Sequence, residues 1–365
     1  MKILMITNKV KTYALGFKNV IEPLLELGHE LVWAADFSKF VGNLEDINCK
    51  IIQIPINSNP LKLCNYKAYK KVLNIIDEEK IEAIYCATPI GGTIGRLAGK
   101  KKKIKPVIYA AHGFLYHKNS SKLRKFIFRS HEKLLSKHTD IFITITKEDY
   151  DEAVKFKLRK NGKLFLIHGA GVEVGKQVLI NKEQKRSEFG IHSNAKVIVS
   201  AGFLNKNKNN KVVVNALGKL QNKNVYYVVC GEGSELDNLK KLTKKYKLED
   251  NIIFAGFRTD IAEVMAMSDI FVMPSFREGV PRSLLEAMDL GLPCIGARTR
   301  GLTEIIVDGV GGYVCHPKKP NEFATAIDKL VNNSNDFGTR NKEEVKKYSK
   351  ECVIEELTNI FKENL

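Results

Sequence analysis

The sequence lacks the apolar runs and cysteine pairs that mark membrane-spanning or disulfide-bonded proteins. No run approaches the ~18 apolar residues that a transmembrane helix needs. The opening MKILMITNK has too short an apolar run for a signal peptide and is typical of a first strand. The seven cysteines are scattered and contain no C-x-x-C pair. We therefore expect neither a disulfide framework nor a zinc site, and a reducing cytosol fits this cysteine usage best.

The fingerprints of common nucleotide-binding sites are also missing. The first expected strand is followed by NKVKTYALG, which lacks the G-x-G-x-x-G of dinucleotide-binding proteins. The stretch CGEGSE at 230–235 holds only two of those glycines and is typical of a tight turn. There is no Walker loop, and no Asp-x-Asp motif of the metal-binding kind follows an expected strand. We therefore expect no NAD, no P-loop nucleotide, no bound metal and no other cofactor.

What the sequence does contain is a regular alternation of strands and helices. Its 365 residues, 44% hydrophobic and 27% charged, exceed what one hydrophobic core usually supports. Short β-branched runs predict buried parallel strands at 2–7, 50–55, 81–87, 106–111, 140–145, 196–202, 225–231, 252–256, 269–274 and 293–297. The pattern predicts an α/β protein with two doubly wound, Rossmann-like domains, at 1–172 and 173–341, joined near Gly171–Gly175. A terminal helix over 342–365 could lie back across the first domain.

The positive charge is concentrated in one segment. The formal net charge is +18, and 100–137 holds twelve Lys and Arg against one acid, which is 12 − 1 = +11. In the expected helix SSKLRKFIFRSHEKLLSKH, one face carries Leu123, Ile127, Ser130 and Leu134, and a parallel stripe carries Lys122, Lys125, Arg129 and Lys133. This pattern predicts a membrane-surface helix. A helix that packs its apolar face on the core and leaves a solvated charged rim would show the same pattern.

Two glutamates bracket the start of a helix in PSFREGVPRSLLEAMDLGLP. Pro281 suits a first helical turn, Gly291 suits its end, Glu286 lies inside the helix and Glu278 stays in the loop before it. Two carboxylates and a helix N-terminus therefore follow an apolar strand, at the edge where open α/β sheets hold ligands. Either glutamate alone could equally be an acid favoured by the helix dipole.

The region from FREG to GGYV, residues 276–314, closely resembles the signature region of retaining glycosyltransferases of family 4, which have the GT-B fold. SAGFLNKNKNNKVVVNAL resembles the family's start of the second domain, and FAGFRTDIAEVMAMSDIFVMPS its base-binding stretch. AAHGFLYHK resembles the acceptor-side loop of capsule and exopolysaccharide members, and LIHGAGVE the crossover between domains. The resemblance spans nearly the whole chain and implies two Rossmann-like domains facing across a cleft, an N-terminal acceptor domain and a C-terminal nucleotide-sugar domain.

The resemblance also implies a role for individual residues. Lys208, which follows the strand-end Gly202 and opens a helix, matches the family's phosphate lysine. A solvated lysine in this Asn/Lys-rich loop is the alternative, and the spacing from Gly202 favours the phosphate role. Glu286 matches the glutamate that accepts both ribose hydroxyls, and Glu278 the one that contacts the transferred sugar. The implied catalytic residues are His112, Lys208 and Glu278, and the implied nucleotide-sugar contacts are Gly202, Lys208, Phe257, Arg258, Glu278, Gly279, Val280 and Glu286. His117 and the cations Lys122, Lys125, Arg129 and Lys133 are assigned to the acceptor and the membrane.

One position departs from the family pattern. Many members carry an arginine directly after the strand-end glycine, where this chain has Phe203. Either another cation supplies the second charge for the diphosphate, with Arg258 and Arg300 as candidates, or backbone N–H groups replace it. Arg282 is less suitable because it should lie one helical turn onward.

These observations predict a metal-independent, retaining hexosyltransferase. It would move a sugar, of the N-acetylhexosamine kind, from a UDP-sugar to a polyprenyl-diphosphate-linked saccharide in bacterial capsule, exopolysaccharide or O-antigen assembly. It would act in the cytoplasm, peripherally on the inner face of the cell membrane, where its partners are the nucleotide sugar, the lipid-linked acceptor and an anionic surface. A nucleotide-sugar 2-epimerase of the same fold stays open as an alternative. A basic nucleic-acid-binding protein fits less well, because no recognition module is present.

Overall fold

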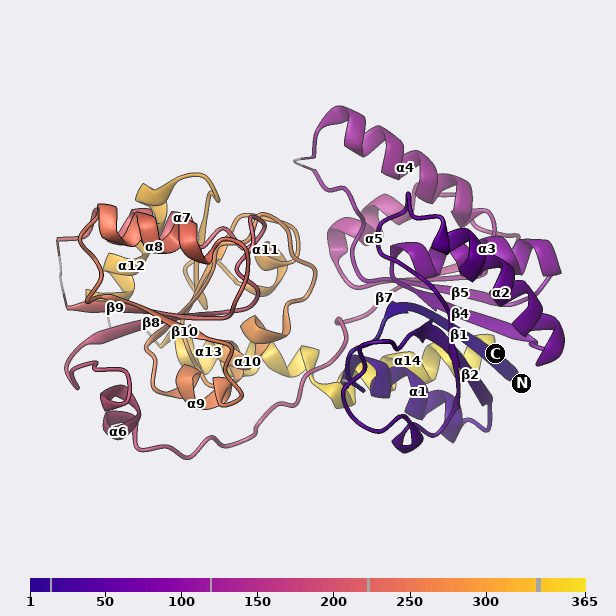
Figure 1. Cartoon of the computed structure of the whole chain (residues 1–365), viewed down its shortest axis with the longest axis horizontal. Coiled ribbons are helices and arrows are strands. Elements are labelled where there is room, and N and C mark those ends of the chain that lie inside the picture. Colours follow the sequence, from indigo (N-terminus) through magenta and orange to yellow (C-terminus); the bar gives the residue numbers. More distant parts are fainter. Residues whose placement is uncertain (14, 119, 222–223, 333–335) are drawn as a thin grey trace. The chain divides into compact units, whose positions relative to one another are not determined.

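The computed structural model describes residues 1–13, 15–118, 120–221, 224–332 and 336–365, and it divides into two compact units (Figure 1). The first unit comprises Met1–Gly171 and Lys350–Leu365, and the second comprises Val172–Ser349. Each unit is a parallel sheet with helices on both faces, which confirms the predicted α/β class and the two Rossmann-like domains.

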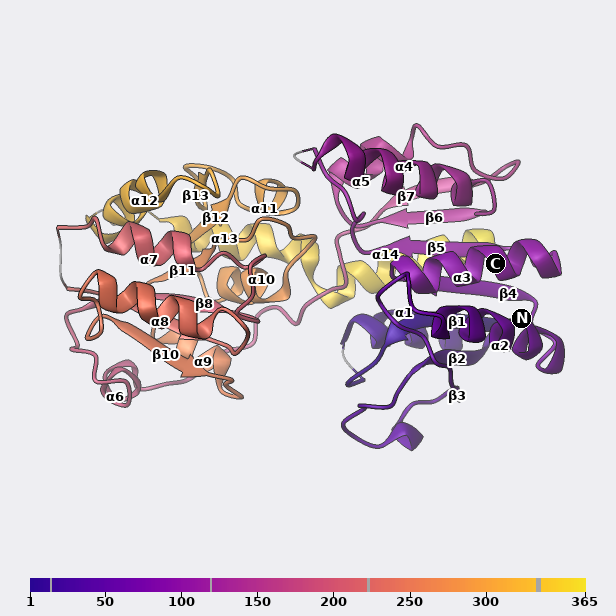
Figure 2. The same cartoon turned by 45° about the horizontal axis from the view of Figure 1, so that its top comes forward.

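Within the described residues, the first unit holds a seven-stranded sheet in the order β3-β2-β1-β4-β5-β6-β7. Its strands are β1 Lys2–Lys9, β2 Glu30–Asp36, β3 Lys50–Gln53, β4 Ala83–Ala87, β5 Val107–Ala111, β6 Ile141–Thr144 and β7 Lys163–Leu166. Its helices are α1 Leu15–Glu26, α2 Cys64–Glu78, α3 Pro89–Lys102, α4 Lys122–Ser136, α5 Lys147–Ala153 and α14 Lys350–Asn364, with a 3-10 turn at Leu44–Asp46. The helices α2 and α3 cover one face of the sheet, whereas α1 and α14 pack together on the other (Figure 2).

The second unit is built in the same way, and its described residues form a six-stranded sheet in the order β10-β9-β8-β11-β12-β13. Its strands are β8 Lys196–Ala201, β9 Val225–Cys230, β10 Ile252–Gly256, β11 Ile270–Met273, β12 Cys294–Ala297 and β13 Gly312–Cys315. Its helices are α6 Lys182–Ser187, α7 Lys211–Leu217, α8 Leu236–Lys245, α9 Ile261–Ala266, α10 Arg282–Asp289, α11 Leu302–Ile305, α12 Pro320–Asn332 and α13 Phe337–Val345, with a 3-10 turn at Lys346–Tyr348.

Continuous β-branched runs form the central strands of both sheets because both faces of these strands are buried. In β8, every residue from Val197 to Ser200 is buried, and β5 is buried throughout. The strands expected from the sequence are all present. The additional strands β2, β7 and β13 complete the sheets, and two of them, β7 and β13, are four-residue strands at sheet edges.

The chain returns to the first unit later than the predicted boundary at residue 342. Helix α13 and the 3-10 turn after it stay with the second unit, because Phe337, Val345 and Tyr348 are buried in that unit's core. From Lys350 onward, α14 packs on the first unit and buries Val353 and Phe361. Phe361 meets Tyr85 of β4 edge-on, with ring centroids 6.2 Å apart.

Candidate active site

Two neighbouring strands of the second unit, β8 and β11, define the candidate site. They are adjacent and parallel, so their carboxyl ends meet at one edge of the sheet. From β8 the chain continues to one side, through β9 and β10, whereas β11 begins the other half of the sheet. This is the switch point at which doubly wound sheets bind ligands, and the loops after β8 and β11 carry Lys208 and Glu278.

Lys208 lies in a turn, not at the start of a helix. The Asn205 carboxamide oxygen accepts from the backbone N–H groups of Asn207 (2.9 Å) and Lys208 (3.1 Å). This local bonding competes with helix formation, so α7 begins only at Lys211, which corrects the prediction that Lys208 opens a helix. The turn is fastened to the loop after β11: the Asn207 carbonyl accepts from Phe276 N–H at 2.8 Å, and its side chain donates to the Arg277 carbonyl at 2.9 Å.

This fastening brings Lys208 and Glu278 together. The Lys208 ammonium nitrogen lies 2.9 Å from Glu278 Oε1, and their side chains are 23% and 13% exposed. Gly202 lies directly beneath the lysine, since a Cβ on that glycine would come within 3.2 Å of Lys208 Cε. The partly buried position means that this pair is less screened than a surface pair, yet solvent still reaches it.

Arg300 approaches the same loop from the other side. Its side chain is buried, and its Nε lies 3.5 Å from the Glu278 carbonyl oxygen. The adjacent Gly301 has a φ of +79°, and a Cβ there would come within 1.8 Å of the Gly279 carbonyl oxygen. A glycine is therefore required at 301 for the two loops to approach so closely.

Several polar groups of this site are available to a ligand. Among the described residues, the N–H groups of Gly279 and Val280 have no acceptor within hydrogen-bond distance. The Ser275 hydroxyl is buried and, within the described part of the chain, has no hydrogen-bond partner. Ser275 lines a small recess with Gly202 and Lys208. Buried polar groups are normally satisfied, so these donors mark a place where a polar ligand could bind.

Glu286 lines a pocket to which Glu278 does not contribute. It lies in α10, whose buried residues include Leu284 and Leu285, and α10 ends before Gly291 as predicted. Pro281 directly precedes the helix. The Glu286 carboxylate is partly exposed and lies 3.7 Å from Arg282 Nη2, one turn away. It lines a pocket of ≈ 200 Å³ together with Lys176, Ile261 and Asp289.

The remaining donor-side residues lie after β10. Phe257 is exposed. Arg258 donates through two nitrogens to Asp260, and these bonds raise the pKa of Arg258. Hydrogen bonds from Arg258 and then from Lys185 hold the pKa of Asp260 well below its usual range. Arg258, one of the two candidates for the second phosphate cation, is therefore held by Asp260 in this structure.

In the first unit, His112 follows the carboxyl end of β5 and is exposed. Gly113 after it has a φ of +110°, a backbone conformation that favours glycine. His117 is half-buried, and its backbone N–H donates to Ser120 Oγ at 3.0 Å.

Helix α4 exposes the apolar face that its sequence predicts. Leu123 and Phe126 are 70% and 72% exposed, and Ile127 and Leu134 on the same face are also exposed. The core-packed alternative is therefore wrong for this face, because α4 instead buries Glu132 and its neighbours Leu135 and Ser136.

The cationic stripe is less uniform than expected. Lys122 and Lys133 are exposed, whereas Lys125 and Arg129 are half-buried. Arg129 forms an ion pair with Glu152 of the neighbouring segment. One of the four predicted membrane cations is thus paired within the unit and a second is half-buried, which corrects the picture of four equivalent surface charges.

A buried ion pair fixes α4 to the unit. Glu132 of α4 accepts from Arg96 of α3 at 2.8 Å, and the Arg96 side chain is fully buried. The Arg96 guanidinium also stacks on Tyr109, 3.7 Å from the ring centroid. Glu132, the one acid in the basic segment 100–137, therefore holds α4 against α3.

One Asp-x-Asp triplet does occur after a strand, at 149–151 in the first turn of α5, which corrects the sequence analysis. Its two carboxylates are used separately. Asp149 is buried and accepts from the backbone N–H of Phe114, whereas Asp151 pairs with Lys147. The triplet therefore carries no grouped set of oxygen ligands.

Two family models match the chain: Glycosyltransferase Family 4 over residues 17–170 and Glycosyl transferases group 1 over residues 181–351. A relative from Bacillus subtilis (strain 168), named "Putative glycosyltransferase EpsD", is 30% identical over 84% of this chain and 83% of its own length. This chain is a family 4 glycosyltransferase.

Solved structures confirm the GT-B fold of this glycosyltransferase. HepE from Anabaena, solved in complex with UDP and glucose, matches with a TM-score of 0.78 at 19% identity, over 100% of both chains. WaaG, a glycosyltransferase involved in lipopolysaccharide biosynthesis, matches with a TM-score of 0.73 at 17% identity, over 99% of both chains. None of the described helices of this glycosyltransferase has both the length and the apolar character that crossing a bilayer requires.

Sequence reasoning missed some residues of the candidate site. Asn207 and Asn209 hold the loops together, and the Asn209 side chain donates to the Pro274 carbonyl at 3.0 Å. The run of asparagines at 205, 207, 209 and 210 was a signal, because asparagine side chains bond to backbone groups in turns. Ser275 was missed because a serine after a strand carries no distinctive pattern.

Proposed function

We propose that this glycosyltransferase moves a sugar of the N-acetylhexosamine kind from a UDP-sugar to a saccharide carried on polyprenyl diphosphate, in the assembly of a bacterial surface polysaccharide. An Escherichia coli relative, 24% identical over 73% of this chain and 72% of its own length, is named UDP-Gal:alpha-D-GlcNAc-diphosphoundecaprenol alpha-1,3-galactosyltransferase. The HepE structure contains UDP and glucose. These two names support a UDP-sugar donor and a lipid diphosphate acceptor.

The observation that carries the proposal is the ammonium of Lys208 at the carboxyl ends of β8 and β11. Transfer breaks the bond between the anomeric carbon and the diphosphate, and negative charge develops on the departing oxygen. Lys208, the nearby Arg300 and the N–H groups of Gly279 and Val280 would stabilise that charge. These groups supply positive charge without a metal, so we propose a metal-independent reaction.

Glu278 has two tasks in this proposal. Without donor, its carboxylate holds the Lys208 ammonium at 2.9 Å, so the cation is already positioned when the diphosphate arrives. With donor bound, Lys208 turns to the phosphate, and Glu278 becomes free to accept a hydroxyl of the sugar being transferred.

The proposed retention of configuration follows from the position of the positive groups beside the departing diphosphate. We propose that the acceptor hydroxyl attacks the anomeric carbon on the face from which UDP departs, so the configuration is retained. The hydroxyl oxygen forms the new bond as the bond to UDP breaks, and its proton passes to the departing diphosphate. His112, exposed at the end of β5, would hydrogen-bond to sugar hydroxyls on the acceptor-domain side.

In this proposal, Glu286 and the pocket that it lines bind the nucleotide part of the donor. A carboxylate with two oxygens can accept both vicinal hydroxyls of a ribose, and the pocket of ≈ 200 Å³ offers apolar walls from Ile261 and Met265. The 3.7 Å distance to Arg282 leaves that carboxylate loosely held. The Glu286 carboxylate can therefore leave Arg282 and bind the ribose at a small cost in free energy.

We propose that α4 brings the enzyme to the membrane that holds its acceptor. An exposed face of Leu123, Phe126 and Ile127, bordered by the exposed cations Lys122 and Lys133, is the arrangement of a helix lying in a lipid interface. Each lysine near an anionic leaflet contributes about 1 kcal/mol, and each apolar side chain that leaves water about 1.5–3 kcal/mol. The exposed apolar face therefore contributes more to binding than the cations.

The test is a panel of UDP-sugars incubated with vesicles that contain a polyprenyl-diphosphate-linked N-acetylglucosamine. We expect one donor to give a lipid-linked disaccharide whose new linkage keeps the α configuration, measured by NMR of the released product. Lys208→Ala should abolish transfer, whereas Lys206→Ala, a lysine in the same turn, should not. An epimerised nucleotide sugar released without acceptor would instead identify the 2-epimerase alternative.

A further inference from the structure

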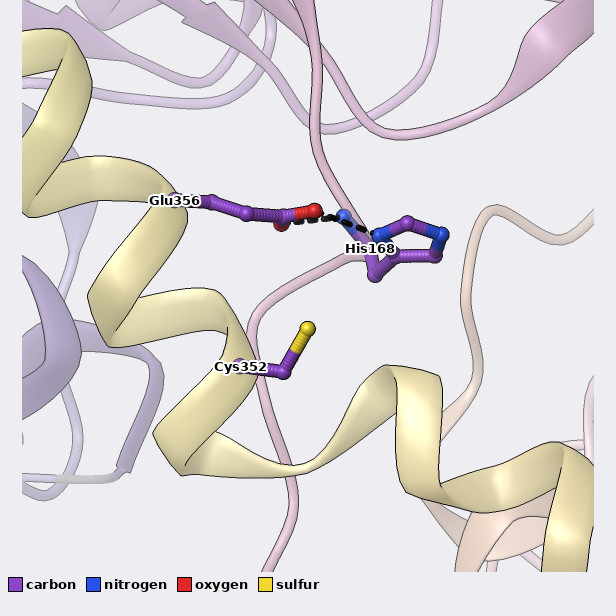
Figure 3. A group of neighbouring side chains, drawn as sticks. All are labelled: His168, Cys352 and Glu356. Atoms are coloured by element: carbon purple, nitrogen blue, oxygen red, sulfur yellow. Dashed lines mark hydrogen bonds and ion pairs between the residues drawn. The ribbon is translucent and has the colours of Figure 1, made fainter.

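Three potential metal ligands converge in the first unit. His168 lies between β7 and Gly171, whereas Cys352 and Glu356 lie on α14, one turn apart, and so share one face of that helix (Figure 3). The ring nitrogen, thiol sulfur and carboxylate oxygen all lie within 4.8 Å of one another, and all three residues are half-buried. Among the described residues, this is the one such grouping of His, Cys, Asp and Glu.

The donor set is that of a borderline or soft divalent ion. Imidazole, thiolate and carboxylate together suit zinc, whereas magnesium and calcium prefer oxygen ligands only. A neutral imidazole, a thiolate and a carboxylate carry two negative charges, which a divalent cation balances.

The geometry needs only a small adjustment. Zinc binds nitrogen, oxygen and sulfur at roughly 2.0–2.3 Å, so donors around a tetrahedral ion lie roughly 3.3–3.8 Å apart. An edge of the triangle at the 4.8 Å limit therefore has to close by about 1–1.5 Å, and the 2.6 Å edge between His168 Nδ1 and Glu356 Oε1 has to open by at least about 0.7 Å. The carboxylate is already oriented, because Glu356 Oε2 accepts from the His168 backbone N–H at 2.9 Å while Oε1 lies 2.6 Å from His168 Nδ1. The His168 side chain is 42% exposed, which leaves an open path for an ion and a position for water.

We propose that His168, Cys352 and Glu356 bind one zinc-type divalent ion, with water completing a tetrahedral coordination. The ion displaces the proton of the Cys352 thiol, which passes to solvent, and takes the place of the hydrogen bond between His168 Nδ1 and Glu356 Oε1. The site is structural: it fastens α14 to the segment before Gly171, at the two points where the chain passes between the units.

Cobalt(II) substitution tests the site, because a cobalt–thiolate bond gives a charge-transfer band that no other ligand here produces. The full chain is stripped with EDTA, kept reduced with a phosphine, and titrated with Co²⁺ and then Zn²⁺. We expect one equivalent of Co²⁺ to give the thiolate band, and zinc to remove it by displacement. Cys352→Ser should lose the band, and Cys64→Ser, a half-buried cysteine of α2, should retain it.

Thermal unfolding provides a second readout. One equivalent of zinc should raise the midpoint of the parent and of Cys64→Ser, but not that of Cys352→Ser or His168→Gln. Absence of the band in the parent overturns the proposal. A band that persists in Cys352→Ser also overturns it, since another thiol would then be the ligand. Sugar transfer is not a readout of this site, so its failure and failure of the proposed function are distinguishable.

Discussion

Removing the charge of Glu286 and removing the charge of Glu278 should have different effects on UDP affinity and on turnover. Glu286→Gln should weaken the binding of UDP itself, because UDP contains the ribose that this carboxylate accepts. A charge-assisted hydrogen bond is worth about 1.5–3 kcal/mol, which is about ten- to a hundredfold in affinity. Since the Glu286 side chain is 39% exposed, we expect the lower end, about tenfold.

Glu278→Gln should leave UDP affinity unchanged or make it slightly tighter. Glu278 Oε1 lies 2.9 Å from the Lys208 ammonium nitrogen and would compete with the diphosphate for it. Ion pairs of moderate exposure are worth about 0.2–1 kcal/mol, so removal of this competitor should tighten UDP by at most about fivefold. Turnover should nevertheless fall, because Glu278 no longer holds the sugar hydroxyl while the anomeric bond breaks.

Calorimetry with UDP and with UMP separates these roles. Glu286→Gln should weaken both nucleotides equally, since both contain the ribose. Lys208→Ala should weaken UDP more than UMP, since only UDP carries the second phosphate. Glu249→Gln, on the exposed turn after α8, is the control and should change neither affinity.

Two results would contradict this assignment. Equal UDP affinity in the parent and Glu286→Gln would remove the ribose role from Glu286. A tenfold loss of UDP affinity in Glu278→Gln would mean that the two carboxylates have exchanged roles.

Three further predictions concern metals, the membrane and α4. Transfer should survive EDTA at moderate temperature, and a loss of turnover that Mn²⁺ or Mg²⁺ restores would refute the metal-independent mechanism. The double variant Leu123→Glu/Ile127→Glu should pellet less with anionic vesicles than the parent while binding UDP equally; unchanged pelleting would show that this face does not meet lipid. Glu132→Gln leaves the buried Arg96 charge unpaired and should lower the free energy of unfolding by about 3–5 kcal/mol in a urea titration, and a loss below ~1 kcal/mol would show that water reaches the guanidinium.

The sequence predicted most of the fold because both sheets bury their strands on two faces. A strand such as β5, which is buried at every position, leaves a continuous apolar run that is recognisable without any partner. Edge strands leave less signal, and β7 has only half-buried or exposed residues. The position of Glu278 in a loop and the end of α10 before Gly291 could also be predicted, because both depend only on neighbouring residues in the chain.

Contacts between distant segments could not be predicted in this way. The sequence showed that α4 is amphipathic, but the face that it buries is decided by Arg96, 36 residues away. The same is true of His168 and Glu356, which are 188 residues apart and meet only because α14 returns to the first unit. Lys208 was expected to open a helix, whereas the Asn205 side chain keeps its backbone in a turn.

The return of α14 has a consequence for how the protein is made. The first unit takes its last helix from residues that the ribosome adds after the whole of the second unit, Val172–Ser349. Until then, the face of α1 and β4 that receives Val353, Leu357 and Phe361 stays uncovered in the nascent chain. A fragment that ends at Gly171 is therefore an unfinished domain, and separate production of the acceptor domain requires the peptide 350–365 to be fused or supplied in trans.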